Sequence, residues 1–230
     1  MKILSPIIFL LTVVLLLTRC NSDSEGGSFN ADHKENTETD SLSGIYDDYE
    51  KYGRANWQKP DFVIRQFGDL SGKTIADIGA GTGFFSRRLV YKAEKVLAID
   101  VNPYILPLLD SVRTNELPKE FGDRLEIRLC EYDDPKLKPE EVDAVLLCNT
   151  FMYINNRVDY LKKVKSGMKP GGILMIIDFK KQRTPLAIPA VENRLKMEEV
   201  VAEMHNAGFL VSKMDRSSLE NQYLVIGEKR

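Results

Sequence analysis

The sequence predicts an α/β fold in which one mostly parallel sheet is doubly wound, with helices on both faces. From residue 59 onward, short apolar segments with strand-like composition alternate with segments that carry apolar residues at helical spacing. Strict alternation of this kind is typical of a doubly wound sheet. In addition, residues 142–149 (VDAVLLCN) form a continuous apolar run, as expected for a central parallel strand that is buried on both faces.

The elements are expected in the following order. A first helix over 59–70 places Phe62, Val63 and Phe67 at helical spacing and ends at Ser71-Gly72. Pro103, a favourable first-turn residue, begins the third helix. Residues 169–172 (KPGG) form a turn before the fifth strand, and the last two strands follow one another as a hairpin. The strands are predicted over 74–79, 95–100, 124–130, 142–149, 173–179, 209–215 and 222–229, and the remaining helices over 83–91, 103–115, 157–167 and 197–207.

Composition excludes several classes of protein. The 230 residues include 32 Lys and Arg against 34 Asp and Glu, a net charge of −2, so the chain has no overall basic field and we expect no nucleic-acid partner. Three cysteines and two histidines are too few for a disulfide scaffold or a typical zinc site, and no metal is predicted.

The N-terminal residues 1–20 are predicted to be directed to a membrane. Met1-Lys2 precedes sixteen uncharged, mostly apolar residues, 3–18, a run too short for a comfortable span of about 20 residues. The segment Leu17-Thr18-Arg19-Cys20 resembles a bacterial lipobox, although Arg19 stands where a small residue is expected. The resemblance implies lipidation of Cys20 and a location in the cell envelope; an uncleaved signal anchor is the alternative.

A tether separates this segment from the folded domain. Residues 21–43 contain six acidic residues, one lysine and a Gly-Gly pair, and such a stretch cannot bury enough apolar surface to offset the entropy lost on ordering. We therefore predict a disordered acidic tether over 21–43 and one folded domain over 44–230.

A glycine-rich stretch after the first strand carries the functional signal. Asp77 is followed by Gly79, Gly81 and Gly83, which is not the dinucleotide fingerprint, because the third glycine of that pattern would fall at Phe84. A carboxylate at the end of the strand disfavours a pyrophosphate and suits a cationic ligand. The glycines allow the backbone to approach a flat nucleoside closely.

Together with an acid, Asp100, at the end of the second strand, this motif resembles the class I S-adenosylmethionine-dependent methyltransferases. The resemblance covers residues 46–228 and includes DIGAGTGFFS, VLAIDVNP and the KPGG turn. It implies a Rossmann-like sheet of strand order 3-2-1-4-5-7-6 with the last strand antiparallel, S-adenosyl-L-methionine as cofactor, and methyl transfer to a small-molecule substrate.

The resemblance also implies which residues bind the cofactor. Asp100 would accept both ribose hydroxyls, Glu131 the exocyclic amine of adenine, and Asn149 would lie at the methionine part. The full set is Asp77, Gly79, Ala80, Gly81, Gly83, Asp100, Val101, Glu131 and Asn149.

The acceptor side is less defined. Similar bacterial methyltransferases often carry a Tyr-His pair after the fourth strand, but here Phe151-Met152-Tyr153 follows, so no catalytic base is assigned. Residues 44–57 are predicted to form a lid, with Tyr49, Trp57 and Tyr153 as candidate substrate residues. The same aromatic residues could instead fill the sheet edge.

Two other functions stay open at this stage. The missing histidine and the export signal are compatible with a non-catalytic nucleoside-binding module of the same fold, since S-adenosylmethionine is made in the cytoplasm. An NAD-dependent oxidoreductase is the third hypothesis.

The cysteines provide a test of topology. With strand order 3-2-1-4-5, two strands separate Cys130 from Cys148, which places their backbones about 14 Å apart, beyond the ~7 Å limit for a disulfide. We therefore predict two free, mostly buried thiols.

Overall fold

The computed structural model describes residues 53–186 and 189–230 of the chain. The predicted membrane-directed segment with Cys20, the predicted tether and Tyr49 lie outside the described residues. Within the described part, no helix is both long enough and apolar enough to cross a membrane.

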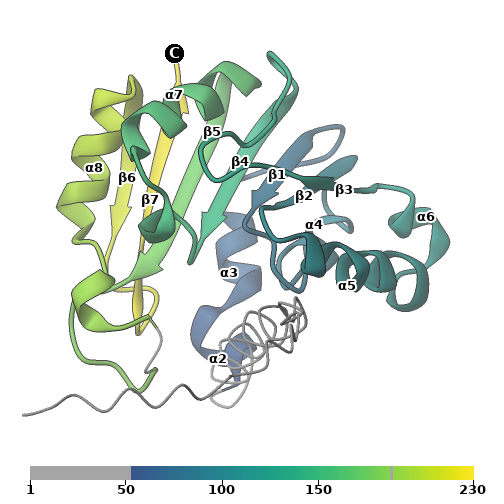
Figure 1. Ribbon diagram of the computed structural model, residues 1–230, viewed down its shortest axis with the longest axis horizontal. Coiled ribbons are helices and arrows are strands. Elements are labelled where there is room, and N and C mark those ends of the chain that lie inside the picture. Colours follow the sequence, from purple (N-terminus) through teal and green to yellow (C-terminus); the bar gives the residue numbers. More distant parts are fainter. Residues whose placement is uncertain (1–52, 187–188) are drawn as a thin grey trace, which may run out of the picture.

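The described residues form a seven-stranded sheet of order β3-β2-β1-β4-β5-β7-β6 (Figure 1), so the predicted strand order is confirmed. Neighbouring strands from β3 to β5 are parallel, and β7 is antiparallel to both β5 and β6. The strands are β1 (Thr74–Ile78), β2 (Lys95–Asp100), β3 (Leu125–Leu129), β4 (Val142–Cys148), β5 (Met168–Phe179), β6 (Phe209–Asp215) and β7 (Gln222–Lys229).

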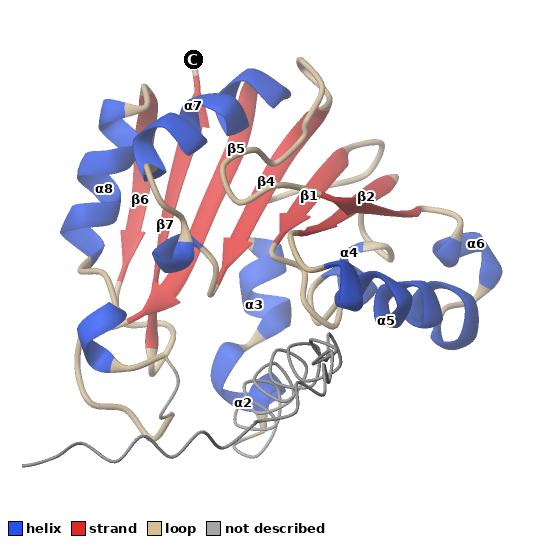
Figure 2. Cartoon of the chain, viewed as in Figure 1, coloured by secondary structure: helices blue, strands red, loops and turns tan. Residues whose placement is uncertain are grey.

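Helices connect the strands and cover the sheet (Figure 2). They are α2 (Arg54–Gln58), α3 (Pro60–Arg65), α4 (Ser86–Leu89), α5 (Leu106–Ser111), α6 (Lys119–Gly122), α7 (Arg157–Gly167) and α8 (Met197–Asn206). Local caps fix two of the boundaries. The side chain of Asn102 accepts a hydrogen bond from the Tyr104 N–H (2.9 Å) before α5, and Glu199 accepts one from the Lys196 N–H (2.6 Å) at the start of α8.

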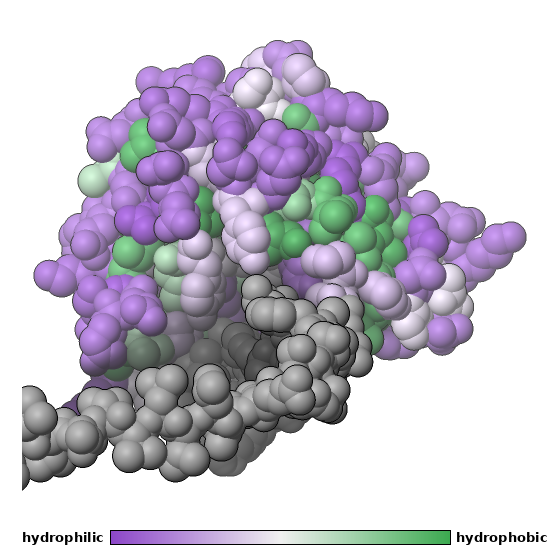
Figure 3. All heavy atoms as spheres, viewed as in Figure 1, coloured by the Kyte–Doolittle hydropathy of each residue, from purple (hydrophilic) through white to green (hydrophobic). Residues whose placement is uncertain are grey.

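The sheet separates two apolar cores because successive strand residues point to opposite faces. On one face, residues such as Ile75, Val96 and Leu146 pack with Val63 of α3 and Leu109 of α5. The other face buries a second set against α7 and α8, which includes Ala76, Leu97, Leu147, Leu161 and Val200. The outer surface visible in Figure 3 is mostly hydrophilic, with hydrophobic atoms gathered toward its middle and right.

Four elements differ from the sequence prediction. The helix predicted over 59–70 is α3, which ends at Arg65. The KPGG segment is part of β5, which begins at Met168; it bulges out of the sheet, because β4 pairs with Met168 and then with Ile173, and Gly171 has φ +75°. The helix predicted over 83–91 is restricted to Ser86–Leu89, since turns occupy the glycine-rich residues. The helix predicted over 103–115 consists of a 3₁₀ turn, α5 and a π-helical end over Val112–Glu116.

Candidate functional site

The predicted cofactor residues lie at the carboxyl ends of β1, β2 and β4, which are neighbours in the sheet. From β1 the chain runs outward to β2 and β3 and then crosses back to β4 on the other side of β1, and ligands of open α/β sheets bind at such a switch point. The turn after β1 is attached to β2 by its backbone: the N–H groups of Gly79 and Ala80 both donate to the carbonyl oxygen of Ile99, at 2.8 and 3.1 Å.

All three glycines of this turn have positive φ, +74° at Gly79, +53° at Gly81 and +78° at Gly83. A Cβ atom at Gly79 would lie 2.2 Å from Oγ1 of Thr150. One at Gly83 would lie 3.0 Å from Leu109. Two of the glycines are therefore required by packing against protein neighbours, in addition to any contact with a ligand.

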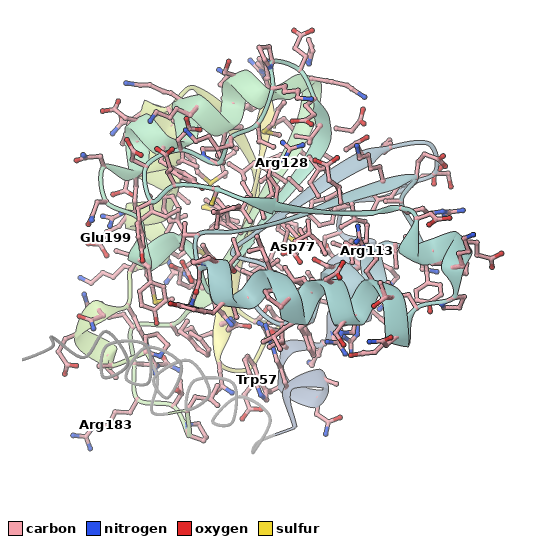
Figure 4. All side chains as sticks on the ribbon, turned by 45° about the vertical axis from the view of Figure 1, so that its right-hand side comes forward. Trp57, Asp77, Arg113, Arg128, Arg183 and Glu199 are labelled. Atoms are coloured by element: carbon pink, nitrogen blue, oxygen red, sulfur yellow. The ribbon has the colours of Figure 1, made fainter. Side chains whose placement is uncertain are left out.

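Asp77 links the turn to the helix that follows it. Its side chain is buried, and its Oδ2 accepts a hydrogen bond from Oγ of Ser86 in α4 at 2.6 Å. Burial raises the pKa of this carboxyl to about 6, against the opposing effects of Ser86 and of the nearby Arg54 guanidinium. Figure 4 shows Asp77 near the centre of the molecule, with Trp57 below it and Arg183 at the periphery.

Asp100 occupies the position predicted for a ribose-binding acid. Its Oδ2 accepts a hydrogen bond from the Gly81 N–H (2.9 Å) and its Oδ1 one from the Asn102 N–H (3.0 Å). Each carboxylate oxygen can accept a further hydrogen bond, so the side chain both fixes the glycine turn and remains able to accept from ligand hydroxyls.

Asn149 follows β4 in the left-handed conformation, with φ +60°. Its side chain is 9 % exposed. Oδ1 accepts a hydrogen bond from Nε2 of Gln222, whereas Nδ2 is buried and has no hydrogen-bond partner among the described residues. A buried donor without a partner is a site at which a ligand oxygen would be stabilised. The carboxylates of Asp77 and Asp100, the glycine turn and this donor together fit a nucleoside that carries an amino-acid group.

The other two predicted cofactor residues lie at the border of the site. Val101 is half-buried against the core of the α7 face. Glu131 is exposed and forms an ion pair with Nζ of Lys136 at 2.8 Å. It follows Cys130, whose N–H donates to the backbone oxygen of Asp100 at 2.9 Å, so it stands beside the end of β2.

The candidate substrate aromatics have different environments. Trp57 is buried and packs on Phe179 with ring centroids 5.7 Å apart, in a small cluster with Met152 and Leu186. Tyr153 is 52 % exposed at the end of β4. Burial, followed by the charge of Asp178, raises the pKa of the Tyr153 phenol, so this group is a hydrogen-bond donor at neutral pH. Trp57 therefore belongs to a buried apolar cluster, and Tyr153 is the described candidate that is open to solvent.

Asp178 is a residue that the sequence analysis missed. It lies near the end of β5 and is fully buried, and no described side chain donates a hydrogen bond to either carboxyl oxygen. Burial raises its pKa well above the usual value, and the Met152 backbone N–H and Arg157 only partly oppose this effect. The available signal was one acid within the apolar strand sequence ILMIIDF.

Histidine and possible metal ligands are considered next, because both often take part in catalysis. His205 is an exposed residue of α8, on the helix layer that packs on the other core face. Among the described residues, no group of three or more His, Cys, Asp or Glu side chains is arranged to hold a metal ion.

Residues 76–176 match a protein-family profile described as a methyltransferase domain. By this match the chain resembles a methyltransferase domain over less than half of its length. It is similar to a crystal structure of a SAM-dependent methyltransferase from Aquifex aeolicus, with 25 % identity, a TM-score of 0.73, and coverage of 82 % of this chain and 98 % of that one. S-adenosylmethionine is the cofactor of this domain, and the residues described above are those that would hold it.

Curated relatives act on different acceptors, as their names state. The tRNA U34 carboxymethyltransferase of Hydrogenovibrio crunogenus is 27 % identical over 74 % of this chain and 49 % of its own length. The ubiquinone/menaquinone biosynthesis C-methyltransferase of Hahella chejuensis is 24 % identical over 59 % of this chain and 54 % of its own length. The chain thus spans about half the length of these relatives. The [4+2]-cyclase SpnF, 16 % identical with a TM-score of 0.65 over 76 % of this chain and 81 % of its own, shares the fold alone.

Proposed function

We propose that the protein transfers a methyl group from S-adenosylmethionine to a small-molecule acceptor. The observation that carries the proposal is the juxtaposition of Asp100, the glycine turn and the unpartnered amide of Asn149 along the carboxyl ends of three neighbouring strands. These groups match the hydroxyl-rich, nucleoside and amino-acid parts of that cofactor.

When bound, the cofactor supplies a methyl group activated by its positively charged sulfur. The residues of this chain then have a positioning role: Asp100 and the turn hold the nucleoside, and Asn149 holds the amino-acid end. Alignment of this kind provides much of the acceleration of a displacement reaction, so the absence of a histidine after β4 does not argue against turnover. A base is needed only for an acceptor that retains its proton at neutral pH.

Three features favour a small acceptor over nucleic acid. The chain carries a net charge of −2, whereas nucleic-acid binding relies on excess positive charge near the site. Tyr153 offers an exposed phenol, and it follows Met152, which belongs to a buried apolar cluster with Trp57, Phe179 and Leu186. An acceptor with an aromatic or aliphatic body and one nucleophilic atom fits these surroundings.

Titration of the full chain with S-adenosylmethionine in a calorimeter tests the proposal, followed by turnover assays on phenols, quinols, thiols, amines and, as a contrasting substrate, tRNA. Replacement of Asp100 by alanine should weaken cofactor binding by about 1–3 kcal/mol, or roughly 5- to 150-fold in dissociation constant, because the ribose hydroxyls lose a charged acceptor. The exposed Asp123 provides the matched control, Asp123→Ala.

The possible results separate the hypotheses. Binding with turnover supports the enzyme, and binding without turnover on any acceptor supports a nucleoside-binding module. Binding of NADH in place of S-adenosylmethionine, or an unchanged dissociation constant in Asp100→Ala, contradicts the proposed site.

The proposal extends to the location of the protein. The sixteen uncharged residues before Arg19-Cys20 support attachment to the cell envelope, with lipid on Cys20. Mass spectrometry of the protein from the membrane fraction tests this, since a soluble protein with a free Cys20 thiol would contradict it.

A further inference from the structure

Four side chains form a continuous hydrogen-bonded chain from α2 to the end of β4. Arg54 and Gln58 belong to α2, Gln222 is the first residue of β7, and Asn149 follows β4. All four are at most 9 % exposed. We call this set the amide relay. It connects three parts of the chain that are distant in sequence and meet at the candidate cofactor site.

The amide relay has a direction, because arginine can only donate hydrogen bonds. Nε of Arg54 donates to Oε1 of Gln58 at 2.7 Å. The amide nitrogen of Gln58 therefore points onward and donates to Oε1 of Gln222 at 3.1 Å and to Sγ of Cys148 at 3.0 Å.

The same logic applies at the next step. With its oxygen accepting from Gln58, Gln222 can donate only through Nε2, and it does so to Oδ1 of Asn149. The oxygen of Asn149 is thus occupied by Gln222, whereas its nitrogen, Nδ2, is buried and has no hydrogen-bond partner among the described residues. The orientation of each amide thus follows from the one before it, and the relay ends in a fixed donor.

The place of this donor identifies the ligand group. Along the sheet, β1 separates Asp100 at the end of β2 from Asn149 at the end of β4, a spacing of about 10 Å for two strand intervals. Thr150, the next residue, packs directly against Gly79 of the turn. With the ribose at Asp100, the amino-acid end of the cofactor falls at Asn149. There the ammonium group can only donate, whereas the carboxylate can only accept.

We propose that Arg54, Gln58 and Gln222 are positioning residues that orient Asn149 as a hydrogen-bond donor to the carboxylate of the amino-acid part of S-adenosylmethionine. This inference rests on the proposed function. It gives the buried residues of α2 and β7 a role in cofactor binding, although none of the three needs to touch the cofactor.

The decisive variant is Gln222→Glu, which keeps an oxygen for Gln58 but cannot donate to Asn149. The amide of Asn149 must then turn its nitrogen toward residue 222 and its oxygen toward the ligand. Calorimetry on the full chain should show at least a tenfold rise in the dissociation constants of S-adenosylmethionine and S-adenosylhomocysteine. The dissociation constant of 5′-methylthioadenosine, which lacks the amino-acid carboxylate, should change less than twofold.

Two further variants make the test specific. Asn149→Asp keeps an acceptor for Gln222 and replaces only the last N–H by an oxygen, so it should give the same ligand-selective loss; it decides the question if Gln222→Glu fails to fold by circular dichroism. Gln66→Glu introduces the same charge change at the C-terminal end of α3, where Nζ of Lys213 donates a hydrogen bond to Oε1 of Gln66 at 2.7 Å. This variant should bind all three ligands like the wild type.

The outcomes separate this inference from the proposed function. Wild-type binding together with unchanged S-adenosylmethionine affinity in the variants, or an equal loss for 5′-methylthioadenosine, overturns the amide relay alone. Absence of S-adenosylmethionine binding by the wild type overturns the proposed function and this inference with it.

Discussion

Asp178 is completely buried, and no described side chain donates a hydrogen bond to its carboxyl oxygens. A charge in such a place is unfavourable, and the raised pKa of the group follows from its burial. Because the pKa is higher in the folded than in the unfolded state, the contribution of Asp178 to stability is complete below about pH 4 and is lost as the pH rises toward the folded-state pKa.

Asp178→Asn removes the ionisation while it preserves the shape of the side chain. We expect the variant to be more stable than the wild type at pH 7, by roughly 1–3 kcal/mol, with a difference that disappears near pH 4. Urea unfolding between pH 4 and pH 8 measures it, with the exposed Asp159→Asn as control. A stability difference that is constant over this range would show that Asp178 is not neutralised by burial.

The positions of two acidic residues at strand ends could be predicted from the sequence, whereas the surroundings of a third could not. Asp77 and Asp100 end apolar strands next to a glycine turn, and both lie where the motif placed them. The position of an acid along a strand does not reveal whether a partner will reach it, so the isolation of Asp178 could not be predicted. The amide relay was equally inaccessible, because its members come from α2, β4 and β7 and meet only through the sheet order.

Arg194 binds several residues of the segment between β5 and α8. Within this segment, residues 187–188 lie outside the described part. Arg194 is 1 % exposed. Its guanidinium donates hydrogen bonds to backbone oxygens of Lys180, Gln182, Leu186 and Pro189 and to Oγ1 of Thr184, at 2.8–3.3 Å. These hydrogen bonds hold the segment in place beside Phe179, whose ring centroid lies 5.2 Å from the guanidinium carbon of Arg194.

Arg194→Met keeps an unbranched apolar stem but removes the guanidinium, so these oxygens lose their donor. We expect the variant to have a lower free energy of local opening in this segment. Trypsin should therefore cleave after Lys180, Lys181 and Arg183 roughly tenfold faster. Electrophoresis and mass spectrometry of a limited digest provide the measurement. Arg216→Met, which removes an exposed arginine paired with Glu198, is the control, and equal cleavage of both variants would show that Arg194 does not hold the segment.

Elements with strong periodicity were predicted well and irregular ones were not. The predicted bounds of β2, β6, β7 and α7 are those of the structure. Pro and Gly favour turns, so the sequence predicts a turn at the KPGG segment, yet its flanking residue Met168 pairs with Val142 and extends β5. The π-helical end of the segment after Pro103 also has no distinct sequence pattern.

The strand order of the whole sheet determines whether the two described cysteines can form a disulfide. Cys130 and Cys148 are free and buried, as predicted from the two strands between them. Burial raises the pKa of the Cys130 thiol to about 12, with a smaller contribution from Asp100, and it raises the pKa of Cys148 as well. Neither thiol forms a reactive thiolate at neutral pH.

We therefore expect both thiols to persist as free groups, even in an oxidising compartment. Iodoacetamide should modify neither residue in the folded full chain and both residues in guanidinium chloride, as counted by peptide mass spectrometry. Cys20→Ser in the same chain removes the remaining cysteine, so that any crosslink must join Cys130 to Cys148. Such a crosslink within one chain would require the ends of β3 and β4 to be adjacent. It would contradict the sheet order, in which β2 and β1 lie between them and separate their backbones by about 14 Å, against a disulfide limit of ~7 Å.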